Sequence, residues 1–145
     1  MIKKNKLILI IFILLSLINY TWAENNFFEE GEKKYQEKKY DQSKFLFQRS
    51  IVFNPKDYNS YLYLAKIYNF EDNRSEVRKN INTVLLLDPK NEEANYILMK
   101  IELKNSNYSK VKELADSFSK ICNVMCDKKT LILESLKNLE PKNES

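Results

Sequence analysis

Two prolines constrain this chain most strongly, because Pro55 and Pro89 end consecutive stretches of equal length that have the same apolar spacing. They recur with a period of about 34 residues, which is typical of stacked helix-turn-helix units. Each unit buries its apolar face against its neighbours, so the period predicts an all-α chain built by repetition. It also favours a binding surface, rather than catalytic side chains, as the origin of function.

Three consecutive segments follow this period, and they span residues 24–57, 58–91 and 92–125. Phe27 in the first segment matches Tyr61 in the second, and Gly31 matches Ala65. The third segment has Asn123 where the proline is expected. Small residues recur where two helices must approach closely, and large apolar residues recur where a helix must fill space, as the packing of antiparallel helices requires.

The residues at these offsets resemble the pattern of the tetratricopeptide repeat (TPR) family. The first repeat supplies Phe27, Gly31, Tyr40, Ser43, Phe47, Ser50 and Pro55. The second supplies Tyr61, Leu64, Ala65, Tyr68, Val77, Val84 and Pro89, and the third supplies Leu98, Met99, Tyr108, Val111, Ala115 and Phe118. The resemblance covers about 100 of the 145 residues. It implies a right-handed superhelical stack of about three TPR repeats, of which the third is degenerate.

The pattern predicts helices at residues 25–37, 41–53, 57–70, 74–87, 91–104, 108–121 and 128–139. Asp41, Ser75 and Ser109 share one offset, and each is expected to cap the second helix of its repeat by accepting a backbone hydrogen bond. Asp57 and Asn91 are expected to cap the first helices of the next repeats in the same way.

The last predicted helix lies in a C-terminal segment, 126–140, and carries its apolar side chains on one stripe. That stripe consists of Leu131, Ile132, Ser135, Leu136 and Leu139. A repeat stack leaves an apolar face open at its end, so this helix is expected to cap it. The alternative is a helix that docks on a partner. Residues 141–145, which begin with Pro141, are expected to be a disordered tail.

Residues 1–23 differ in composition from the repeats. Lys3, Lys4 and Lys6 precede an apolar run over residues 7–18, and small Ala23 precedes a polar stretch. This order predicts an export signal peptide cleaved after Ala23. The run is shorter than the roughly 20 apolar residues of a membrane span. The alternative is an uncleaved N-terminal anchor, since Trp22 suits a membrane interface.

Charge argues against nucleic acid as a partner. The whole chain has 24 basic and 20 acidic residues, for a net charge of +4. Removing the three lysines of residues 1–23 leaves 21 basic residues against 20 acidic ones. A nucleic-acid binder is expected to keep a strong positive stripe, which a nearly neutral mature chain does not have.

The two cysteines, Cys122 and Cys126, fall between the third repeat and the capping helix. In an exported chain they are expected to pair as a structural disulfide. Free buried thiols are the alternative. With no histidine in the sequence and only two thiols, a metal site has too few good ligands, and no cofactor is expected. The commonest general base is also absent, so we expect no enzymatic activity.

In the TPR family, the first helices of successive repeats line a concave groove. By resemblance, the groove residues expected to bind a partner here are Phe28, Tyr35, Leu62, Tyr63, Lys66, Tyr96, Lys100 and Lys104. Aromatic side chains with a few basic groups suit a peptide or helix held by apolar anchors and a polar rim. The alternative is that the aromatic residues only complete the packing between helices.

Some TPR proteins hold the C-terminal carboxylate of chaperones through lysine, asparagine and arginine side chains. The matching positions in this chain are Phe28, Glu32, Tyr63, Glu93 and Ile97. None has the required type, and two are acidic, so binding to a chaperone tail by that mechanism is not expected.

Together these features predict an exported, most simply periplasmic, TPR scaffold or adaptor that binds another protein or peptide in its groove. Its expected role is in assembly or maintenance of the cell envelope. The alternative is a self-associating or membrane-anchoring module without a different protein in the groove. Secretion, or tethering through residues 1–23, remains the alternative to a periplasmic location.

Overall fold

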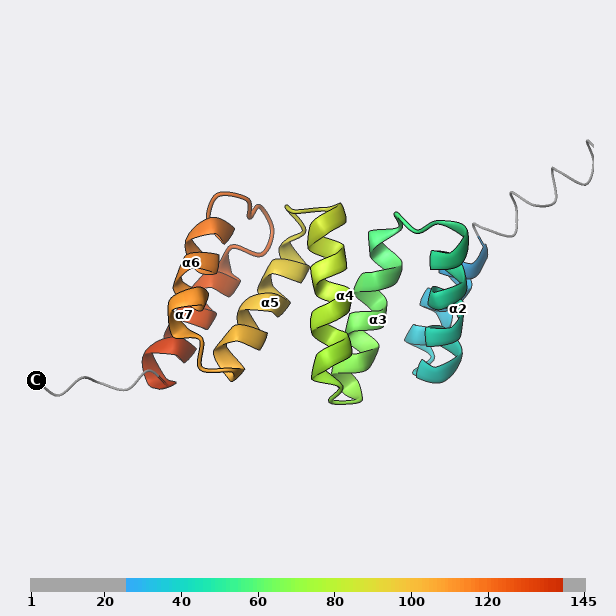
Figure 1. Ribbon diagram of the computed structural model, residues 1–145, viewed down its shortest axis with the longest axis horizontal. Coiled ribbons are helices and arrows are strands. Elements are labelled where there is room, and N and C mark those ends of the chain that lie inside the picture. The colour runs from blue at the N-terminus through green and yellow to red at the C-terminus, as the bar shows by residue number, and fades with distance from the viewer. Residues whose placement is uncertain (1–25, 140–145) are drawn as a thin grey trace, which may run out of the picture. The chain divides into compact units, whose positions relative to one another are not determined.

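The computed structural model describes residues 26–139, and every regular element in that range is an α-helix (Figure 1). A helix over residues 26–36 is followed by α2 (Tyr40–Phe53), α3 (Tyr58–Phe70), α4 (Arg74–Leu87), α5 (Glu92–Lys104), α6 (Tyr108–Phe118) and α7 (Asp127–Leu139). The predicted all-α organisation is confirmed. The signal peptide at 1–23 and the disordered tail at 141–145 were predicted for segments outside the described residues.

The repeat period is visible in the backbone as well as in the sequence. Lys38, Asp72 and Ser106 each lie in the turn between the two helices of a repeat, and their φ angles are 59°, 51° and 58°. Positive φ is uncommon for residues other than glycine. The three residues occupy the same position in successive repeats, so each repeat uses the same turn geometry.

The caps of the second helices differ from the prediction. The residues before α2, α4 and α6 are Lys39, Asn73 and Asn107, so Asp41, Ser75 and Ser109 lie inside their helices. Of the three, only Asn73 accepts a capping bond, from the amide of Glu76 at 3.3 Å. The predicted caps were two residues too late, because the helices begin at Tyr40, Arg74 and Tyr108.

The predicted caps after the prolines are confirmed. Asp57 Oδ1 accepts from the amide of Asn59 at 3.1 Å, and Asn91 Oδ1 accepts from the amide of Ala94 at 3.0 Å. The other oxygen of Asp57 also accepts from the hydroxyls of Ser50 and Ser60. One carboxylate therefore joins the end of α2 to the start of α3.

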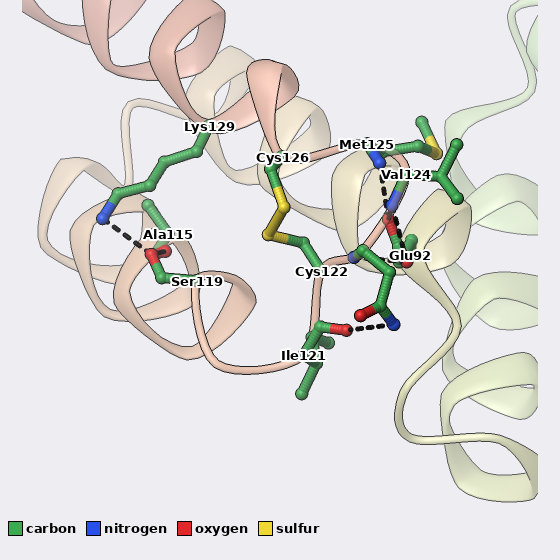
Figure 2. Close-up of a disulfide and its surroundings, with 10 residues drawn as sticks. Glu92, Ala115, Ser119, Ile121, Cys122, Val124, Met125, Cys126 and Lys129 are labelled. Atoms are coloured by element: carbon green, nitrogen blue, oxygen red, sulfur yellow. Dashed lines mark hydrogen bonds between the residues drawn. A yellow bond between two sulfur atoms is a disulfide. The ribbon is translucent and has the colours of Figure 1, made fainter.

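Helix α6 ends at Phe118, three residues before the predicted end. After Phe118 two backbone hydrogen bonds span three residues in place of four: the amides of Lys120 and Ile121 donate to the carbonyl oxygens three residues earlier. A disulfide between Cys122 and Cys126 then closes the loop to α7, with the two Cα atoms 5.3 Å apart (Figure 2).

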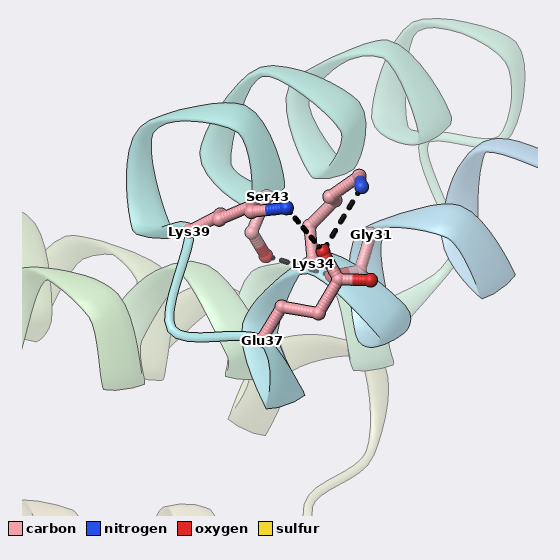
Figure 3. Close-up of polar contacts among 5 residues, drawn as sticks. All are labelled: Gly31, Lys34, Glu37, Lys39 and Ser43. Atoms are coloured by element: carbon pink, nitrogen blue, oxygen red, sulfur yellow. Dashed lines mark hydrogen bonds and ion pairs between the residues drawn. The ribbon is translucent and has the colours of Figure 1, made fainter.

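The chain divides into two compact units, and the division falls within α3, between Tyr63 and Leu64. In the first unit, Phe47 of α2 is fully buried and packs on Gly31. The buried hydroxyl of Ser43 donates to the carbonyl oxygen of Gly31 at 2.8 Å, so the two helices approach closely at this point (Figure 3). The sequence prediction that Gly31 marks close helix packing is confirmed.

Charged side chains pair at the turn after the helix of residues 26–36. Glu37 forms ion pairs with Lys39 at 2.8 Å and Lys34 at 3.1 Å (Figure 3). Hydrogen bonds from Lys39 and then Lys34 lower the pKa of Glu37 to about 2, so its carboxylate stays charged in more acidic solution than an ordinary glutamate does.

In the second unit, α7 packs against α5 and α6 (Figure 1). A single buried cluster joins the three helices, and it consists of Met99, Val111, Ala115, Phe118, Ile132 and Leu136. Within this unit, α7 therefore covers apolar side chains of α5 and α6. Leu131 and Leu139, which were predicted on the same stripe, are instead exposed. No helix in residues 26–139 is long and apolar enough to span a membrane.

Candidate partner-binding site

The predicted groove residues of the first unit form an aromatic cluster, defined here as Phe28, Tyr35 and Tyr63. The ring of Tyr63 contacts Phe28 and Tyr35 edge-on, with centroid distances of 5.9 and 5.0 Å. It also stacks on buried Phe47, with the rings 17° apart and their centroids separated by 4.9 Å. All three members are only half-buried. The structure therefore brings together residues that sequence reasoning placed on two helices.

A hydrogen bond adds polarity at this cluster. The hydroxyl of Tyr63 donates to Glu32 Oε1 at 2.7 Å, which ties α3 to the helix of residues 26–36. Leu62, the fourth predicted groove residue of this unit, is only 7% exposed and belongs to the buried core. Its side chain therefore has little surface to offer a partner.

The predicted residues of the second unit form a basic patch, defined as Lys66, Tyr96 and Lys100. The ammonium of Lys66 pairs with Glu93 at 2.8 Å. The ammonium of Lys100 lies 4.7 Å from the centre of the Tyr96 ring, a cation–π contact. Burial lowers the pKa of Lys100, and the nearby charge of Lys104 lowers it further, while Glu93 opposes both effects. An anionic group bound at this patch would offset the repulsion between Lys100 and Lys104.

Lys104, the last predicted groove residue, is exposed and lines a cavity formed by the ends of α3 and α5 and the start of α4. No other member of the predicted groove set lines that cavity. The charge of Lys104 therefore acts on Lys100, and the side chain of Lys104 also lines this cavity.

Both acidic residues at the chaperone-tail positions have partners within the fold. Glu32 accepts the hydroxyl of Tyr63, and Glu93 pairs with Lys66. A carboxylate arriving at these positions would meet negative charge, as the sequence predicted.

One carboxylate, that of Glu92, organises the loop between α6 and α7. Glu92, the first residue of α5, accepts hydrogen bonds from the amides of Asn123 at 2.8 Å, Val124 at 3.1 Å and Met125 at 2.7 Å (Figure 2). The bonds from Met125, then Asn123 and Val124, lower the pKa of Glu92. The carboxylate and these amides lie far apart along the chain, so no local sequence pattern predicts their hydrogen bonds.

Metal chemistry finds no support in the described part of the chain, where no group of three or more His, Cys, Asp or Glu side chains is arranged to hold an ion. The chemistry available at the aromatic cluster and the basic patch is that of binding: apolar contact, hydrogen bonding and charge.

No protein-family model matches the sequence, and no curated protein matches it significantly. Solved structures do match its fold. The TPR2B domain of yeast Sti1, in complex with pHsp70, has a TM-score of 0.71 at 13% identity, covering 82% of this chain and 99% of that one. The TPR domain of Arabidopsis OM64 has a TM-score of 0.70 at 14% identity, covering 81% and 97%. The Yersinia enterocolitica type III secretion chaperone SycD, in complex with a peptide of the translocator YopD, has a TM-score of 0.69 at 13% identity, covering 79% and 92%.

Proposed function

We propose that this chain, which has the fold of tetratricopeptide repeat domains, is a scaffold that binds a segment of another protein through the faces of its first helices. The fold supports this proposal, since structures that share it are described as complexes with peptides or proteins. The observation that carries it is the aromatic cluster, whose three rings are positioned by tight packing yet remain half-exposed. Half-exposed aromatic residues held rigidly are favourable anchors for a partner.

The basic patch of the second unit, taken by itself, supports a partner segment that carries acidic groups. Lys66 and Lys100 are two cations in a patch with Tyr96, and Glu93 offsets part of their charge. Charges at the rim of an interface chiefly speed association and select among partners. We propose that binding needs no catalytic turnover, and that shape and charge complementarity supply the whole of the function.

We further propose that the chain is exported and acts in the periplasm, in assembly or maintenance of the envelope. The order of charge and hydrophobicity in residues 1–23 supports export. The Cys122–Cys126 bond is consistent with an oxidising compartment. The N-terminus of the protein recovered from producing cells tests this directly. A chain starting at Glu24 supports cleavage, whereas a chain starting at Met1 in the membrane fraction supports the anchor.

A photo-crosslinking experiment tests the partner surface. A photoreactive phenylalanine derivative replaces Tyr35 in the aromatic cluster, or Phe45, an exposed aromatic residue on α2, as the matched control. Adducts with one different protein from position 35, and none from position 45, would support the aromatic cluster as a partner site. Equal adducts from both positions, or none from position 35, would overturn it.

Self-association is the second candidate function, and exposed apolar side chains on α2 favour it. Phe45 is 57% exposed and Val52 is 76% exposed. SycD, which shares the fold, is also described as a dimer. Sedimentation over a range of concentrations separates the two candidates. A mass that doubles with concentration, together with adducts of the chain with itself from position 45, would favour self-association.

A further inference from the structure

A small cavity in the second unit is lined by no member of the aromatic cluster or of the basic patch as defined above. The end of α3, the start of α4 and the end of α5 form its walls, and its volume is about 180 Å³. Pockets that hold drug-sized ligands are typically about 300–1,000 Å³. The cavity is therefore suited to a group about the size of one amino-acid residue.

Three cationic side chains line the cavity: Arg74, Arg78 and Lys104. Asp72 also lines it and pairs with Arg74 at 3.4 Å. Arg78 donates to Glu102 behind the wall at 2.5 Å. The negative charges of Asp72 and Glu102 offset two of the three cations, which leaves one positive charge in excess. That excess matches a ligand with a single negative charge.

The wall between the charges is apolar. Val77 of α4 is almost completely buried and Ile101 of α5 is half-buried, and both line the cavity. A small inorganic anion would leave the exposed part of Ile101 in contact with water. A ligand with a short aliphatic part would cover it and gain hydrophobic stabilisation.

Polar groups beside this wall can orient a planar anion. Ser75 and Asn105 line the cavity along with the cations, and Arg74 presents its guanidinium with most of its surface exposed. Guanidinium groups bind carboxylates with two parallel hydrogen bonds, which fixes the orientation of the ligand.

We propose that this cavity binds a small aliphatic carboxylate, with the carboxylate between Arg74 and Lys104 and the aliphatic part against Val77 and Ile101. The site goes beyond the proposed partner-binding function, since no member of the aromatic cluster or of the basic patch lines it. Lys104 is the one residue that it shares with the predicted groove set.

Pentanoate is the probe that tests the site, and the full chain labelled with ¹⁵N is the protein. Titration should shift the amide signals of Val77, Ile101 and Asn105 together, with a Kd on the order of 1 mM, as expected for a ligand of this size. Binding should weaken as salt is added, because the cations are at the surface. Absence of these shifts would overturn the proposal.

Two control ligands test the two halves of the proposed chemistry. Pentanol keeps the aliphatic chain without the charge, and inorganic phosphate keeps negative charge without the chain. Both should bind much more weakly than pentanoate. Equal binding of pentanol would overturn the role of the cations, and equal binding of phosphate at the same amides would overturn the role of the apolar wall.

Variants separate this site from a general effect of charge. Arg74→Ala and Lys104→Ala should each weaken pentanoate binding about three- to tenfold, the expected loss for one hydrogen bond to a charged group near the surface. Lys79→Ala removes an exposed cation from the same helix, α4, outside the cavity, and should leave binding unchanged. Equal weakening in all three variants would contradict a specific site.

Discussion

The ring of Phe47 lies so close to Gly31 that a Cβ atom added to the glycine would stand 2.8 Å from Cε1 of the ring. Phe47 is fully buried and stacks on Tyr63, so its ring has little room to move. The φ angle of Gly31 is not in the left-handed region, so its backbone conformation does not require glycine. Glycine is required because the Phe47 ring, which supports the aromatic cluster, leaves no room for a Cβ atom where the two helices approach.

Gly31→Ala should therefore destabilise the protein by about 1 kcal/mol. Overpacking a core costs about 1–3 kcal/mol, while alanine gains about 1 kcal/mol or less over glycine in a helix. Urea denaturation measures the change. In the double variant with Phe47→Leu, part of the clash should be relieved, so the two effects should not be additive. A stabilised Gly31→Ala variant would show that Phe47 moves freely.

Removing Arg78 should expose the cost of burying Glu102. Glu102 is buried, and its pKa is lowered by hydrogen bonds from Arg78 and then Asn107. Arg78→Ala takes one of these two hydrogen bonds from the carboxylate, so we expect a loss of about 1–3 kcal/mol in the free energy of unfolding. Lys79→Ala, which removes a neighbouring exposed cation, should change stability by less than about 0.5 kcal/mol. Similar losses in both variants would contradict a specific role for the pair.

Stability should also decline in acid because of Glu92. Its pKa in the folded protein is below its ordinary value of 4.5. The stabilisation is therefore complete above that value and is lost as the pH falls through the lower, folded-state pKa. Glu92→Gln should reduce this dependence on pH and speed the amide exchange of Asn123 and Met125 at neutral pH. Unchanged exchange rates would show that the loop is held without the carboxylate.

The disulfide should contribute modestly. The bond closes a loop of sequence separation 4, for which the chain-entropy relation gives about 2 kcal/mol. Cys122→Ser with Cys126→Ser should lower the unfolding free energy by about that amount, and adding a reductant to the parent chain should reproduce the effect. If reductant has no effect on stability, the bond is not a structural constraint of the folded state.

The sequence predicted the helices well because its signals are local and recur once in every repeat. Helix positions and the packing role of Gly31 follow from apolar spacing and residue size. The caps at Asp41, Ser75 and Ser109 were wrong because each of these residues is the second residue of its helix. The turn residues with positive φ before these helices are not glycines, so the sequence does not mark the turns.

The candidate sites were harder to predict because they depend on contacts between distant residues. Arg78 and Glu102 lie 24 positions apart, and no periodic pattern pairs them. The cavity beside them needs the ends of three helices, so it follows from tertiary packing alone. Leu62 was assigned to the groove from its repeat offset, yet the pairing of neighbouring helices buries it.

The loop that Glu92 binds explains why the third repeat has no proline at position 123. A proline at position 123 would have no N–H, and the amide of Asn123 donates one of the bonds that the carboxylate accepts. The first two repeats stiffen their connections covalently, through the rings of Pro55 and Pro89. The third does so with one negative charge and a disulfide, so its departure from the repeat pattern is an exchange of one means of rigidity for another.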